Sequence, residues 1–145
     1  MKSKLIHSGA QKTWAIIFGL GDEVMEGLQR FAKEQQLTAS QITGIGAFSD
    51  CVLGFFSFEQ RGYKRITVSD QCELLSLIGD VALSDGEPKI HVHVVLGKED
   101  GTARGGHLLS AHVKPTVEII LTESPRHLHR RHDPASGLAL IDFGE

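Results

Sequence analysis

His91, His93 and His107 are the residues of this chain whose types and spacing are best suited to chemistry. The first two alternate with apolar residues, as in a strand. Side chains on a strand alternate between its faces, so both rings point the same way, roughly 6.5–7 Å apart along the backbone. Two such imidazoles can share a metal ion, and His107, after two glycines, can supply the third ligand of an open zinc-type site. The alternative is a pair of half-exposed histidines with His107 far away, because most histidines bind nothing.

Two carboxylates lie in apolar segments that read as strands. Glu73 and Glu118 must be paired, hydrogen-bonded or exposed to water there. Either could accept a hydrogen bond from a ligating histidine, through the ring nitrogen that does not bind the metal, or act as a general base beside the metal. The alternative for both is an outward strand position or an ion pair at an interface.

A basic stretch near the C-terminus contains a second His-x-His. Arg126, Arg130 and Arg131 surround His127 and His129. Several cations together repel a divalent metal but attract a phosphate or a carboxylate, so the three arginines are candidate anion contacts. The alternative is a solvated loop, ordered at a subunit interface.

Length and composition predict a single domain spanning residues 1–145, because 41% hydrophobic and 23% charged residues are ordinary for a globular protein. No apolar run approaches ~20 residues, so we expect no membrane span. The first residues lack the apolar core of a secretory signal, which makes the cytoplasm the expected location. The net charge of −3 lowers the expectation of tight DNA binding, which normally needs a basic excess.

The pattern in the first part of the chain predicts a buried strand over 13–18 and a helix from about Glu23 to Gln35, with Asp22 as its N-cap. After Gln41, apolar residues punctuated by glycines predict a strand, a tight turn and a second strand.

The second part predicts further strands. One spans Glu73 to Leu83, bends at Gly79 and forms a hairpin with the strand that carries His91 and His93. A glycine-rich loop is expected over 97–106. Shorter strands are expected at 62–68, 115–121 and 138–143. One helix followed by many short strands indicates an α+β domain with a large, mainly antiparallel mixed sheet.

Taken in order, several segments of the chain resemble the stand-alone prokaryotic PPC domain (plants and prokaryotes conserved domain), which accompanies AT-hooks in plants. The segments are GDEVMEGLQRFAKEQQL, ITGIGAFSDCVLGFF, ELLSLIGDVAL, HVHVVLGKEDGTARGGHL and VKPTVEIILTE. The resemblance implies a central sheet packed by helices, a homotrimer, and a metal, often zinc, held by His91, His93 and His107. The Arg-Gly-Arg-Pro of an AT-hook is absent, so the minor-groove contact of the plant proteins is not expected.

Two functions follow. The first is a metal-binding homotrimer in which three neutral histidines lower the pKa of a bound water, and which acts on a small-molecule ligand. Zinc is the first choice of divalent metal, and iron or another transition metal is the alternative. The second is a regulatory or protein-interaction module, or a DNA-binding protein, without catalytic activity. Lys64 and Arg65 would then add phosphate contacts to those of the three arginines. Whether the metal site lies within a protomer or at a subunit contact stays open.

Overall fold

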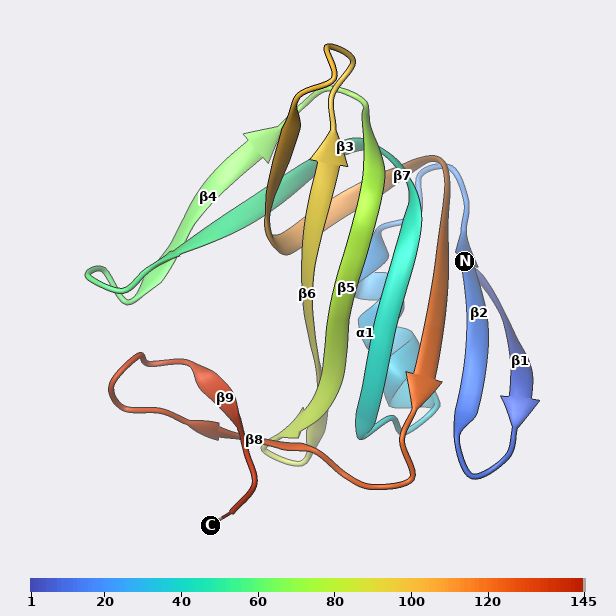
Figure 1. The fold of residues 1–145 in the computed structure, drawn as a ribbon, viewed down its shortest axis with the longest axis vertical. Coiled ribbons are helices and arrows are strands. Elements are labelled where there is room, and N and C mark those ends of the chain that lie inside the picture. The colour runs from blue at the N-terminus through green and yellow to red at the C-terminus, as the bar shows by residue number, and fades with distance from the viewer. Residues whose placement is uncertain (145) are drawn as a thin grey trace.

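The computed structural model describes residues 1–144, which form one helix and nine strands. In chain order the elements are β1 (Lys2–Ser8), β2 (Lys12–Phe18), α1 (Val24–Glu34), β3 (Ala39–Ser57), β4 (Gly62–Val68), β5 (Cys72–Ser84), β6 (Glu87–Gly97), β7 (Ala103–Glu123), β8 (His129–His132) and β9 (Ala139–Asp142). Figure 1 shows the β3–β4 and β8–β9 hairpins extending to the same side of the molecule.

The sheet has the order β1-β2-β7-β3-β5-β8-β9, with β4 paired to β3. β6 pairs with β5 along its length and also with the first residues of β7. Since β7 pairs with β3, and β3 with β5, these four strands form a closed circuit of hydrogen bonding. Every pairing is antiparallel except that of β5 with β8. The mainly antiparallel sheet expected from the sequence is therefore confirmed.

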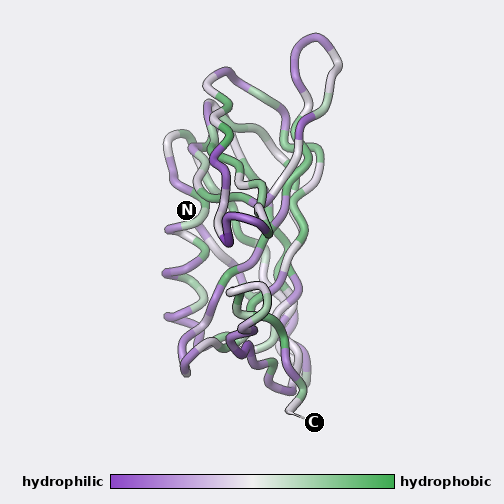
Figure 2. The backbone as a smooth tube through the Cα atoms, turned by 90° about the vertical axis from the view of Figure 1, so that its left-hand side faces the viewer, coloured by the Kyte–Doolittle hydropathy of each residue, from purple (hydrophilic) through white to green (hydrophobic). Residues whose placement is uncertain are grey.

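The helix covers one face of the sheet. Its buried stripe consists of Val24, Gly27, Leu28, Phe31 and Ala32, and Phe31 meets Trp14 edge-on with ring centroids 5.8 Å apart. Figure 2 shows the polar side of α1 turned away from the sheet. The single helix predicted from the sequence pattern is confirmed. The several helices implied by the family resemblance are not found among the described residues, where strands account for the remaining regular structure.

The start of the helix also differs from the prediction. Glu23, in extended backbone conformation, is the N-cap, and its carboxylate accepts the N–H of Glu26 at 2.5 Å. Asp22 instead accepts the N–H of Gly19 and pairs with the N-terminal amine. Because the chain turns helical only after Glu23, the longer acid reaches the first turn and Asp22 stays in the preceding loop.

The region after Gln41 is one long strand rather than two strands around a turn. β3 continues past Gly44 and Gly46 without a turn. The pairing register shifts between these two glycines, and again near Phe48, so the strand contains bulges there. Such bulges bend a strand without ending it. β3 can therefore pair with β7 along most of its length, and on its other edge with β5 at one end and with β4 at the other.

The expected loop over 97–106 is also shorter than predicted. β7 begins at Ala103, so Gly105, Gly106 and His107 belong to a strand. β1 and β8 were not predicted at all. The β5–β6 hairpin was predicted and is confirmed, although the irregularity in β5 falls between Leu74 and Ser76. Among the described residues, no helix is long and apolar enough to cross a membrane.

Candidate metal centre

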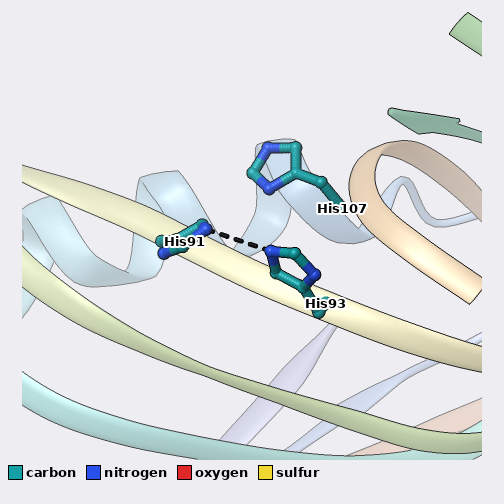
Figure 3. Close-up of side chains that lie close together, drawn as sticks. All are labelled: His91, His93 and His107. Carbon is teal, nitrogen blue, oxygen red and sulfur yellow. Dashed lines mark hydrogen bonds between the residues drawn. The ribbon is translucent and has the colours of Figure 1, made fainter. Parts of the chain in front are cut away.

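The structure brings His91, His93 and His107 together on the face of the sheet opposite the helix (Figure 3). His91 and His93 lie on β6, where the alternate residues Val92 and Val94 are buried. The β6–β7 register places His107 directly opposite His93. The Nε2 atoms of His91 and His93 are 3.2 Å apart, and one ring nitrogen from each of the three lies within 4.8 Å of the others.

The surroundings of two of the rings lower their pKa and keep His91 and His107 neutral near pH 7. Burial lowers the pKa of His107 from its ordinary 6.5 to about 4, and the rings of His91 and His93 add to the effect. Burial and then the charge of Arg130 lower the pKa of His91, against the opposing effect of Asp80. Neutral imidazole carries the lone pair that a metal ion needs.

The donor set fits a divalent transition metal. Nδ1 of His107 is buried and has no hydrogen-bond partner among residues 1–144. Buried polar atoms almost always have a hydrogen-bond or metal partner, so we expect Nδ1 of His107 to bind a partner that the protein atoms do not supply. A metal ion shared by the three rings would satisfy it, and imidazole nitrogens suit zinc, copper, iron and nickel.

One aromatic side chain of the β3–β4 hairpin packs against His107. The ring of Tyr63 stacks on His107 with centroids 4.7 Å apart and 22° between the planes. Gly54 lies opposite His107 in the β3–β7 register, and a Cβ there would come within 2.7 Å of the Tyr63 ring. Glycine at this position therefore leaves room for the stacked tyrosine, which the sequence analysis did not connect with the site.

A carboxylate and a guanidinium lie behind His91. Asp80 on β5 is directly opposite His91 in the register, and its Oδ2 is 3.8 Å from His91 Nδ1. Arg130 on β8 donates to the other oxygen of Asp80 at 2.5 Å, and its side chain is only 6% exposed. Asp80 was missed by the sequence analysis, and Arg130 was considered only as an anion contact.

The other predicted residues lie apart from the cluster. Glu73 and Glu118 are exposed, and within residues 1–144 neither forms a hydrogen bond or an ion pair with the three histidines. Arg126 is exposed, while Arg131 pairs with Asp142 at 2.9 Å. The three arginines therefore do not form one cationic patch.

A family model describes this combination of fold and sequence. The model of the Plants and Prokaryotes Conserved (PCC) domain, also abbreviated PPC, matches residues 6–125. The chain belongs to this family. The PCC match contains all three histidines and Asp80, and it ends before Arg130.

Solved structures share the fold over nearly the whole chain. A PPC protein from Pyrococcus horikoshii is 34% identical, with a TM-score of 0.85 and coverage of 99% of this chain and 96% of its own. The metal-containing protein AF0104 from Archaeoglobus fulgidus is 30% identical, with a TM-score of 0.83 and coverage of 97% and 99%.

A third structure has a different description. The protein from Bacteroides thetaiotaomicron, named as a candidate DNA-binding protein, is 27% identical, with a TM-score of 0.88 and coverage of 99% of both chains. No curated protein matches the chain.

Proposed function

We propose that this PCC-domain protein binds one divalent metal ion per chain through His91, His93 and His107 and acts on a small molecule there. The observations that carry the proposal are the convergence of one ring nitrogen from each of the three histidines and the buried, unpartnered Nδ1 of His107. The description of the Archaeoglobus fulgidus relative as metal-containing supports it. Zinc is the first choice, with iron or another transition metal as the alternative.

The protein's own residues would shape the chemistry. A metal held by three histidines supplies a Lewis acid with a coordination position open to water or a substrate. Tyr63 stacks on His107 and restricts its ring, while Ile78, opposite His93 in the register, presents an apolar side chain beside the cluster. These groups favour a small, partly apolar ligand. The proposed location of the protein is the cytoplasm.

Elemental analysis tests the metal site. We expect about one equivalent of metal per chain in wild type, after zinc loading and dialysis, as for a preformed three-ligand site. His107→Ala should lose the metal. His112→Ala is the matched control, because His112 is exposed and pairs with Asp50 away from the cluster. The proposal is wrong if wild type retains no metal, or if His107→Ala retains as much as the control does.

We also propose that the protein forms the homotrimer implied by its family, through the sheet face that carries the histidines. Six apolar side chains on this face are between 41% and 59% exposed: Ile17, Ile45, Leu75, Ile78, Val95 and Ile120. Cross-strand register aligns Ile78 and Ile120 on either side of Thr43, so they form a continuous surface. Exposed apolar surfaces of this kind mark interfaces, and this one would bring a second subunit beside the metal.

Light scattering coupled to size-exclusion chromatography tests the trimer. Ile78→Glu should dissociate it, because the substitution places a charge in the buried face. Leu20→Glu is the matched control, since Leu20 is exposed in the loop before the helix. A monomeric wild type, or equal masses for the two variants and wild type, would contradict the trimer.

DNA binding is a second candidate function, favoured by the name of the Bacteroides thetaiotaomicron relative and by one surface. Lys64 and Arg65 on β4 are exposed, and no acidic partner lies within ion-pair distance of them in the described chain. Binding through phosphates would weaken steeply with salt and would fall in Lys64→Ala/Arg65→Ala. Absence of binding at low salt would eliminate this candidate.

A further inference from the structure

An unpaired lysine lies beside the three histidines on the face of the sheet opposite the helix. Lys89 precedes His91 by two residues on β6, so its side chain points to the same face, roughly 6.5–7 Å further along the strand. Lys89 is exposed, and no carboxylate of the described residues lies within ion-pair distance of it. Burial and the two neighbouring imidazoles lower the pKa of His107, and the charge of Lys89 adds to the effect, so its field reaches the cluster.

A second unpaired cation lies on the same face, on β4. The register places Arg65 opposite Gly54, and Gly54 opposite His107, so the three residues form one row across the sheet. The backbones of Arg65 and His107 are therefore two strand spacings apart, roughly 9–10 Å. Gly54 has no side chain, and the Tyr63 ring covers it and stacks on His107. Arg65 is exposed, and within residues 1–144 it also has no carboxylate partner.

The other charges on this face do not supply a counter-ion. Asp80 and the buried Arg130 neutralise each other, since a terminal nitrogen of Arg130 donates to Oδ1 of Asp80 at 2.5 Å. Glu73 and Glu118 form no ion pair with the cluster or its two cations in the described chain. Imidazole ligands bring no negative charge, so a divalent metal held by them would keep its double positive charge. A site with one sign of charge attracts ligands of the opposite sign.

The uncharged neighbours of the cluster select among anions. Ile78 lies opposite His93 in the register and is 58% exposed. On the other side of the cluster, the Tyr63 ring stacks on His107. A hydrocarbon chain gains free energy by burial against such groups, whereas a fully polar anion such as phosphate does not. The surroundings therefore favour an organic acid with a short apolar chain.

We propose that the metal centre binds a small organic acid, whose carboxylate lies between the metal ion and Lys89. Arg65 strengthens the positive field from further away, and the hydrocarbon part of the acid packs against Ile78 and Tyr63. The inference rests on the proposed metal function and adds a substrate class to it. It assigns Lys89 to the site as a binding residue, which neither the sequence analysis nor the donor set did.

Titration of the zinc-loaded chain with matched probes tests the charge of the ligand. The probes are 3-methylbutanoate and its neutral amide, which have nearly the same shape, and binding is followed by NMR through the signals of Tyr63 and His107. We expect the acid to bind at least about tenfold more tightly than the amide, because charged partners strengthen its hydrogen bonds. Inorganic phosphate should bind more weakly than the acid. Equal affinities for acid and amide, or phosphate binding as tight as that of the acid, would overturn the proposal.

Substitution of the cations tests the residues. Lys89→Gln should weaken binding of the acid about 3–5-fold, the range of one exposed ion pair, and leave the amide unchanged. Arg65→Gln should weaken it by about twofold, since its charge acts from a greater distance. Lys12→Gln is the matched control, because Lys12 is exposed at the start of β2, which pairs with β7 far from His107. Equal affinities of Lys89→Gln and Lys12→Gln for the acid contradict the assignment of Lys89 and overturn the proposal.

Elemental analysis of the titrated samples separates this proposal from the metal function. If zinc is retained through the histidines but the acid is not preferred, the metal site stands and the organic acid is the wrong ligand. If wild type retains no zinc, the proposed function is wrong and the inference fails with it.

Discussion

Gly79→Ala should disrupt the proposed metal centre without changing any of the three histidines. Gly79 on β5 lies opposite Val92, the residue between the two histidines of β6. A Cβ at position 79 would lie 2.5 Å from Cγ1 and 2.8 Å from Cα of Val92, and closer still to the carbonyl oxygen of His91. Ordinary contact begins at 3.4 Å. Because two of these atoms belong to the backbone, β6 would have to move by about 1 Å to accept one methyl group.

The cost follows from that shift. Overpacking of a tight site costs about 1–3 kcal/mol, and loss of a backbone hydrogen bond between β5 and β6 adds about 1 kcal/mol. We expect the free energy of unfolding, measured by denaturant titration, to fall by about 2–4 kcal/mol. Metal retention should fall as well, since His91 and His93 move with β6.

Gly62→Ala is the matched control for this experiment. Gly62 also lies in a strand, but the nearest atom to an added Cβ is 3.7 Å away, within ordinary contact. Its unfolding free energy should fall by no more than about 0.5 kcal/mol. If Gly79→Ala is as stable as this control and retains as much metal, the close approach of β5 and β6 does not constrain the site.

Three further predictions concern the metal-free protein. Burial lowers the pKa of His107 from 6.5 to about 4, so below pH 6.5 the ring becomes protonated in the unfolded chain while it stays neutral in the folded chain. The free energy of unfolding of the metal-free protein should therefore fall as the pH is lowered from about 7 to about 4. We expect a fall of only roughly 1–2 kcal/mol, because the ring is half-buried and solvent screens part of the effect. His107→Gln should flatten that part of the profile. Gly54→Ala should displace Tyr63 from His107, remove the ring-current shift of the His107 protons in NMR, and cost about 1–3 kcal/mol in denaturant titration. The carboxylate of Glu123 accepts hydrogen bonds from the backbone and side chain of Thr38 and from Ala39 and Ser40. Glu123→Ala should cost about 2–4 kcal/mol by the same titration, against little change for exposed Glu118→Ala.

Local patterns predicted those parts of the molecule that depend on nearby residues. The amphipathic spacing after Glu23 gave the helix, and alternation around His91 and His93 placed both rings on one face. The same patterns failed at glycines. Gly44 and Gly46 resembled a turn, and Gly105 and Gly106 resembled a loop, yet all four lie within long strands. A glycine bulge and a glycine turn have similar composition, and only the pairing partner distinguishes them.

His107 shows the limit of spacing as a guide to the site. Its place opposite His93 depends on the pairing of β6 with the first residues of β7, which closes the circuit through β3 and β5. No pattern within a single segment of the sequence predicts that these four strands close into a circuit. The family resemblance supported His107 as a ligand in the sequence analysis, and pairing between distant strands is what brings it to the other two rings.

Asp80, by contrast, could have been found from the sequence. Asp85 and Gly86 have φ values of 51° and 79°, which suit a two-residue turn of the kind that Asp-Gly favours between strands. Counting outward from that turn pairs Ser84 with Glu87 and Asp80 with His91. A turn type fixes the register of a hairpin, and Asp80 and His91 are the fifth residues on either side of this turn, so the register places the carboxylate beside the first histidine. Arg130 does not follow in this way, because β8 meets β5 by a parallel pairing after a long excursion of the chain.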